Sequence, residues 1–195
     1  MDDDDRMTDL ALKDRDGLPD ALRVLLADYP RDQWASDPGF DGLVRFWLDR
    51  HLMFRKLLAN LQDDAEALLD ARMDPQRYVA GLSRYGGMFV NGLHEHHTIE
   101  DTYYFPTLSQ RDTRISRGFD ILDRDHHDID DYLNSFVAAA NGTIKGLDDR
   151  DKLQNEVGHL RSEVLTLTAL LNRHLTDEEE LIVPVILKFG TAGLG

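Results

Sequence analysis

The sequence predicts an all-α protein, an antiparallel up-down four-helix bundle with a short N-terminal helical extension. Apolar residues recur at intervals of three and four along most of the chain, and no convincing stretch alternates with a period of two. Four long segments with this period are joined by short breaks, which is typical of antiparallel neighbours. The length of 195 residues suits a single domain that can bury a core of its own.

The first half of the chain contains the extension and two long helices. Residues 1–39 are expected to form an acidic tail and an extension, with a short helix over Pro19 to Ala27. The first long helix is predicted from about Phe40 to Ala71. Asp74 as N-cap and Pro75 at the first helical position open the second, which reaches roughly Ser109.

The second half contains two more long helices. Thr113 is the expected cap of the third, and Asn141-Gly142 marks its end. Asp148 or Asp149 starts the fourth, and Gly190 stops it. The expected organisation is therefore an extension at residues 1–39, a bundle at residues 40–190 and a C-terminal tail at residues 191–195.

Charge and composition exclude several classes of function. A formal net charge of -15 repels phosphate backbones and acidic lipid surfaces, so neither nucleic acid nor a membrane is an expected partner. The start, MDDDDR, is the opposite of a basic signal-peptide region, and the apolar run Leu181 to Leu187 is too short to span a bilayer. The chain has no cysteine, which excludes thiolate ligands and suits a reducing compartment. We expect a cytoplasmic protein whose metal ligands, if present, are nitrogen and oxygen.

A repeated motif carries the chemistry of the chain. HHTIEDTYYFP begins at His96 and HLTDEEELIVP at His174, and each places a glutamate four residues after its histidine and a proline six residues later. The offsets 174 − 96, 178 − 100 and 184 − 106 are all 78. His51 and His126 form a second pair, each followed by apolar residues after three and seven positions. The chain therefore contains a duplicated two-helix unit.

The duplicated unit predicts a metal centre. A histidine and a glutamate four residues apart lie about 6 Å apart along one helical face, so both can reach one buried point. Two facing units bring four imidazoles and two carboxylates into the core, which suits two metal ions bridged by both carboxylates. The expected cofactor is a pair of iron ions with an oxo or hydroxo bridge; manganese and zinc are alternatives, because ligand type alone does not select the metal.

These motifs resemble those of the hemerythrin-like, or HHE cation-binding, family over about Phe40 to Phe189. The resemblance implies the following metal ligands: His51, His96, Glu100, His126, His174 and Glu178. The oxygen-carrying hemerythrins place a second histidine four residues after the first on the third helix, and this chain has Asp130 there. The resemblance therefore implies that reversible oxygen carriage is not the role.

Several neighbouring residues are assigned less directly. His97 lies about 100° around the helix from His96, so we expect it beside the site or on the surface, although His97 and Asp101 repeat the His–Glu spacing. Tyr103 and Tyr104 are expected to pack, with one of them able to hydrogen-bond a ligand on the metal.

The function predicted is a non-haem di-iron protein that binds or reacts with oxygen, peroxide or nitric oxide, with sensing or detoxification ahead of transport. Iron storage or donation by the same site is one alternative. An HD-type metal-dependent phosphohydrolase, with His127-Asp128 and a histidine from residues 94–97, is another, but it leaves the repeat unexplained. The sequence does not identify a redox partner or an oligomeric state, and it leaves open whether the protein is an enzyme.

Overall fold

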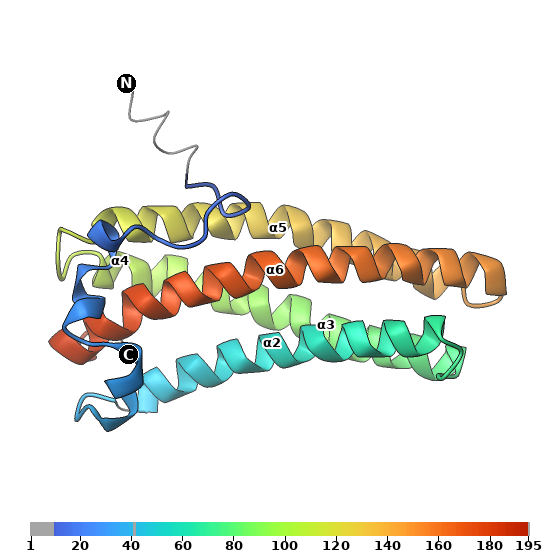
Figure 1. Ribbon diagram of the computed structural model, residues 1–195, viewed down its shortest axis with the longest axis horizontal. Helices are drawn as coiled ribbons and strands as arrows, with labels where there is room; N and C mark the ends of the chain where they lie inside the picture. The colour runs from blue at the N-terminus through green and yellow to red at the C-terminus, as the bar shows by residue number, and fades with distance from the viewer. Residues whose placement is uncertain (1–9, 41, 195) are drawn as a thin grey trace, which may run out of the picture. The chain divides into compact units, whose positions relative to one another are not determined.

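The described chain is built from helices and their connections. The computed structural model describes residues 10–40 and 42–194, and within these ranges there is no β-strand (Figure 1). The long helices are α2 (Gly42–Leu69), α3 (Pro75–Ile99), α5 (Ser116–Lys145) and α6 (Arg150–Phe189). The all-α prediction is confirmed. The acidic run at residues 2–5 lies outside the described residues.

Local chemistry explains most of the helix ends. Asp74 accepts a hydrogen bond from the backbone N–H of Arg77 at 2.9 Å, as expected for the N-cap of α3. Asp149 does the same for α6, accepting from the backbone N–H groups of Asp151 and Lys152 at 3.1 Å each. Gly190 follows α6 with a φ of 75°, the left-handed conformation that glycine adopts without strain. These predicted boundaries are confirmed.

Two predicted elements are wrong in detail. Helix α5 begins at Ser116 rather than at Thr113, and it continues through Asn141-Gly142 to Lys145. Gly142 serves close packing here, because a Cβ at this position would lie 2.4 Å from Oε2 of Glu156. The extension has no α-helix over Pro19 to Ala27. It forms three short 3₁₀ turns instead, at Asp20–Leu22, Val24–Ala27 and Arg31–Ser36.

The second predicted helix contains an irregular segment. After α3, residues Glu100–Tyr104 form a π-helical turn, and the short helix α4 (Phe105–Leu108) follows. The backbone N–H of Phe105 bonds the carbonyl of Glu100, five residues earlier. Pro106 has no N–H to give to the residue four positions before it, which favours the wider turn. Glu100, a predicted ligand, is thus the first residue of a π-helical turn.

The chain forms two compact units. Unit 1 contains the described parts of residues 1–51, 96–128 and 172–195, and unit 2 contains residues 52–95 and 129–171. Each long helix contributes one segment to each unit. All six predicted metal ligands belong to unit 1.

The core of unit 1 includes the N-terminal extension. Leu18, Leu25 and Trp34 are 1–3 % exposed and belong to the same apolar cluster as Trp47 of α2 and residues of α4, α5 and α6. The indole N–H of Trp34 donates to the carbonyl of Tyr29 at 2.7 Å. Burial of a large apolar side chain stabilises a fold by about 1.5–3 kcal/mol. The extension is therefore part of the folded unit.

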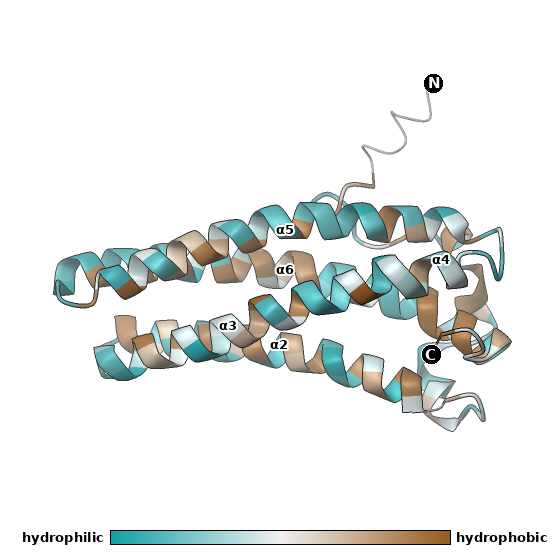
Figure 2. Ribbon diagram, turned by 180° about the vertical axis from the view of Figure 1, so that it is seen from behind, coloured by the Kyte–Doolittle hydropathy of each residue, from teal (hydrophilic) through white to brown (hydrophobic). Residues whose placement is uncertain are grey.

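Unit 2 has an aromatic core. Phe54, Phe89 and Phe136 are almost fully buried, and their rings make edge contacts with centroids 6.3 and 6.0 Å apart. Hydrophobic residues recur along each long helix between hydrophilic ones (Figure 2). Among the described helices, none combines the length and the apolar character that a bilayer-crossing segment requires.

Two glycines provide a paired test of packing. A Cβ at Gly118 would lie 2.9 Å from Cδ2 of the buried Leu181, whereas a Cβ at Gly87, inside α3, would meet nothing within 4 Å. We expect Gly118→Ala to lower the free energy of unfolding by about 1–3 kcal/mol through overpacking. Gly87→Ala should raise it by about 0.5–1 kcal/mol through helix propensity. Urea unfolding measures both changes, and a shift of the same sign in the two variants would contradict this packing.

Candidate metal centre

The six predicted ligands come from four helices and one π-helical turn. His51 lies on α2, His96 on α3 and His126 on α5, while α6 supplies His174 and Glu178. The side chains of His51, Glu100, His174 and Glu178 are fully buried, and His126 and His96 are 3 % and 9 % exposed. Polar groups are rarely buried so completely unless they have partners to bind.

Each glutamate lies between two imidazoles. The Nε2 atom of His96 is 3.0 Å from Oε1 of Glu100, and the Nε2 atom of His126 is 3.7 Å from Oε2 of the same carboxylate. Oε2 of Glu178 is 3.5 Å from Nε2 of His51 and 3.5 Å from Nε2 of His174. This arrangement is the one expected of carboxylates that bridge two metal ions.

Two groups of side chains could each hold an ion. One group contains His51, His96, Glu100 and Glu178, and the other contains His97, His126 and His174, with the ligand atoms of each group within 4.8 Å of one another. The structure therefore brings all six predicted ligands together. It also adds a seventh candidate, His97.

The sequence places His97 either beside the site or on the surface, and the surface alternative is wrong. His97 is 4 % exposed, and its ring stacks on that of His126 with centroids 3.9 Å apart and planes 7° apart. The repeat could not indicate it, because the residue 78 positions later is Leu175. The available signals were the adjacent histidines 96 and 97 and the four-residue spacing of His97 and Asp101.

Three imidazoles have a carboxylate behind them. Nδ1 of His51 lies 2.9 Å from Glu179, Nδ1 of His126 lies 2.7 Å from Asp101, and Nδ1 of His174 lies 3.3 Å from Asp125. A carboxylate accepts a hydrogen bond from the Nδ1–H group, so each Nε2 keeps its lone pair for a metal. The sequence reasoning did not single out Asp125 or Glu179 as partners of the predicted ligands.

Electrostatics in the site keep His96 and His97 neutral, whereas the carboxylates of Glu178 and Glu179, against the effect of burial, raise the pKa of His51. Burial, together with the charges of neighbouring histidines, lowers the pKa of His96 to about 3 and lowers the pKa of His97 well below its ordinary value. Burial and the negative charge of Glu178 raise the pKa of Glu100. Because metal ions bind neutral imidazoles and ionised carboxylates, metal binding at this site should release protons.

Several buried polar atoms in the site lack a hydrogen-bond partner. They are both ring nitrogens of His97, both carboxylate oxygens of Glu100, Nε2 of His126 and of His174, and Oε2 of Glu178. Such atoms each cost about 1–3 kcal/mol when nothing satisfies them. Since all are nitrogen or oxygen donors in one buried cluster, the residues present fit metal ions as partners.

The remaining candidates lie around this cluster. Tyr104 packs on Trp47 with ring centroids 4.9 Å apart, and the indole N–H of Trp47 donates to Oε1 of Glu178 at 2.7 Å. Tyr103 is 64 % exposed. Asp130 is half-buried and belongs to neither group of candidate ligands. A direct bond from a tyrosine to a ligand on the metal stays a prediction.

His97 can be tested by an apolar replacement. His97→Leu removes a buried imidazole without hydrogen-bond partners, so the metal-free protein should gain about 1–3 kcal/mol of unfolding free energy. If His97 is a ligand, the same variant should bind metal more weakly and show a smaller metal-induced rise in melting temperature.

His127→Leu is the matched control, because His127 is also adjacent to a predicted ligand but is exposed. It should change neither the free energy of unfolding of the metal-free protein nor the binding of metal. Unaltered metal binding in His97→Leu would restrict His97 to a packing role.

The comparisons with known proteins agree with this site. The family model described as the hemerythrin HHE cation binding domain matches residues 42–186. Neither a search of curated proteins nor a search of solved structures found a significant match. The match covers most of the chain and contains all six predicted ligands together with His97. The chain therefore belongs to the hemerythrin HHE cation-binding family.

Proposed function

We propose that this protein is a non-haem di-iron protein that reacts with oxygen, peroxide or nitric oxide, and that α2, α3, α5 and α6 form an antiparallel up-down bundle around the iron pair. The supporting observation is the set of buried nitrogen and oxygen atoms that have no hydrogen-bond partner in unit 1. Their positions on both sides of Glu100 and Glu178 suit two ions bridged by carboxylates.

The donor set assigns ligands to two ions. His51 and His96 would hold one ion, and His97, His126 and His174 would hold the other, with Glu100 and Glu178 within reach of both groups. Imidazole and carboxylate donors suit iron, and the absence of thiolate removes a preference for softer ions. A bound iron pair supplies reversible electron transfer to small oxidants and open positions for diatomic molecules.

The surroundings of the imidazoles favour oxidation over carriage. Carboxylates on Nδ1 of His51, His126 and His174 raise the donor strength of these rings, which stabilises the higher charge of ferric iron. The absence of an imidazole at Asp130 does not by itself favour oxidation, because His97 adds a third imidazole to the group of His126 and His174. The support for oxidation comes instead from the anionic partners of the histidines.

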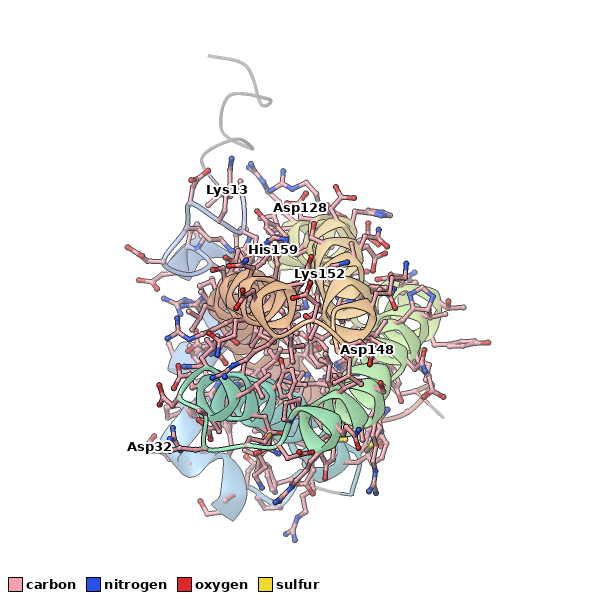
Figure 3. All side chains as sticks on the ribbon, turned by 90° about the vertical axis from the view of Figure 1, so that its right-hand side faces the viewer. Lys13, Asp32, Asp128, Asp148, Lys152 and His159 are labelled. Carbon is pink, nitrogen blue, oxygen red and sulfur yellow. The ribbon has the colours of Figure 1, made fainter. Side chains whose placement is uncertain are left out.

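The phosphohydrolase alternative gains no support. It requires His127 and Asp128, and both side chains are exposed, while the adjacent His126 is buried among the other site residues (Asp128 is labelled in Figure 3).

The number of ions follows from the bridging glutamates. Iron-loaded protein should contain two iron ions per chain by elemental analysis. Glu100→Ala should remove most of this iron, because it deletes a donor shared by both ions. Asp130→Ala, outside both groups, should retain it. Equal loss in the two variants, or one ion per chain in the unaltered protein, would contradict the bridged pair.

The reaction with oxygen separates carriage from oxidation. Stopped-flow spectra of the reduced protein should show conversion to a stable diferric form, with no oxygen recovered under vacuum. Asp101→Asn weakens the anionic partner of His126 and should raise the reduction potential in a spectroelectrochemical titration, whereas Asp130→Asn should leave it unchanged. Repeated uptake and release of oxygen would restore transport as the role. Rapid loss of iron to a chelator, with no reaction with oxygen, would favour storage or donation.

A further inference from the structure

The described part of the N-terminal extension carries three arginines spaced eight residues apart, and each bonds an acidic side chain of α5 or α6. Arg15 donates from Nη1 to Oδ1 of Asp125 at 2.8 Å and from Nε to Oδ2 of Asp177 at 2.9 Å. Arg31 donates to Oε2 of Glu179 at 2.5 Å. Arg23 pairs with Glu180. The extension, blue in Figure 1, is therefore tied to both helices by charge.

Two of these acids are the ones that hold site imidazoles. Asp125, bonded by Arg15, accepts from Nδ1 of His174 through its Oδ2 atom at 3.3 Å. Glu179, bonded by Arg31 through Oε2, accepts from Nδ1 of His51 through Oε1 at 2.9 Å.

Two unbroken chains of bonds result, Arg15–Asp125–His174 and Arg31–Glu179–His51. His174 and His51 belong to different groups of candidate ligands, so each group is connected to the extension once.

We propose that the extension, residues 10–36, is a positioning element of the metal centre, in which Arg15 and Arg31 fix the carboxylates that orient one imidazole of each group. This inference rests on the proposed metal centre and goes beyond the family match, because residues 10–36 precede the matched region at 42–186. Arg15 and Arg31 are positioning residues, since neither belongs to a group of candidate ligands.

The physical role of the arginines is to hold the carboxylates in one orientation. A guanidinium binds both oxygens of Asp125, through Nη1 and Nη2, which leaves the carboxylate little freedom to rotate. Without that fork, the carboxylate could turn toward a metal ion and release the ring of His174. Groups that orient metal-bound histidines typically change metal affinity about 10–100-fold when they are mutated.

The extension is held firmly enough for this role. Leu18, Leu25 and Trp34 lie in the core of unit 1. The backbone N–H of Leu18 donates to Oδ1 of Asp177 at 3.0 Å, and Arg15 also donates to the carbonyl of Leu10 at 2.9 Å. The arginines are therefore presented from a packed segment.

Arg23 provides a control within the same segment. It lies midway between the other two arginines and pairs with an acid of α6 in the same way, but Glu180 contacts no imidazole among the described residues. Arg31 is the better of the two test positions, because its side chain is 48 % exposed and its loss should not unfold the protein. Loss of Arg15 would leave Asp125 buried without its cation and Asp177 with Arg173 alone.

The experiment compares Arg31→Gln with Arg23→Gln in the full chain. Cobalt(II) is titrated against a competing chelator, and the optical spectrum of bound cobalt is recorded. We expect Arg31→Gln to weaken cobalt binding about tenfold and to alter the spectrum. Arg31→Lys, which keeps the positive charge, should recover part of the affinity. Arg23→Gln should match the unaltered protein in both measurements.

A second readout does not require metal. Nitrogen NMR of the metal-free protein, recorded at a pH where the ring of His51 is neutral, should show a single tautomer with the proton on Nδ1, which becomes mixed in Arg31→Gln and stays single in Arg23→Gln. Equal cobalt affinity and equal tautomer populations in the two variants would overturn the inference. Absence of cobalt binding in the unaltered protein would contradict the proposed function instead, and the NMR comparison would still decide the role of Arg31.

Discussion

The burial of two glutamates among five histidines is the constraint on which the rest of unit 1 depends. Glu100 and Glu178 are fully buried, and burial of a carboxylate is strongly unfavourable unless charges or donors compensate for it. The compensation is uneven. Oε1 of Glu178 accepts from the indole N–H of Trp47, whereas Oε2 of Glu178 and both oxygens of Glu100 lack a hydrogen bond. A site of this kind is suited to binding cations, because only one of its four carboxylate oxygens has a hydrogen bond.

The π-helical turn is a local answer to the same constraint. Glu100 and Asp101 begin this turn, and they serve one imidazole from two sides, because His126 has Glu100 near Nε2 and Asp101 on Nδ1. In the second half of the repeat, Glu178 and Glu179 lie in regular helix within α6 and flank His51 in the same way, with Glu178 3.5 Å from Nε2 and Glu179 2.9 Å from Nδ1. The two halves of the repeat therefore reach a similar end with different backbones.

The sequence predicts those features that arise from local periodicity and duplication. Asp74, Asp149 and Gly190 act where their backbone chemistry indicates, and the repeat identifies six residues that the structure brings together. Features that break the duplication were not accessible in this way. His97 has Leu175 as its counterpart.

The sequence also could not predict which acid pairs with which imidazole when the two lie far apart in the chain. The partner of His174 is Asp125, 49 residues earlier in the chain, and no local pattern distinguishes that acid from the many others in this acidic protein. The 3₁₀ turns of the extension likewise follow tertiary packing of Leu25 and Trp34 rather than an amphipathic period.

The packing of the extension has a practical consequence for the boundary of the folding unit. A recombinant fragment cut to the family match, residues 42–186, would keep every candidate ligand but lose Leu18, Leu25 and Trp34 from the apolar core. It would also leave Asp125 and Asp177 without Arg15. Such a fragment would expose an apolar face and leave Asp125 without its cation. Its aggregation or poor metal content would then reflect the missing extension rather than the chemistry of the centre.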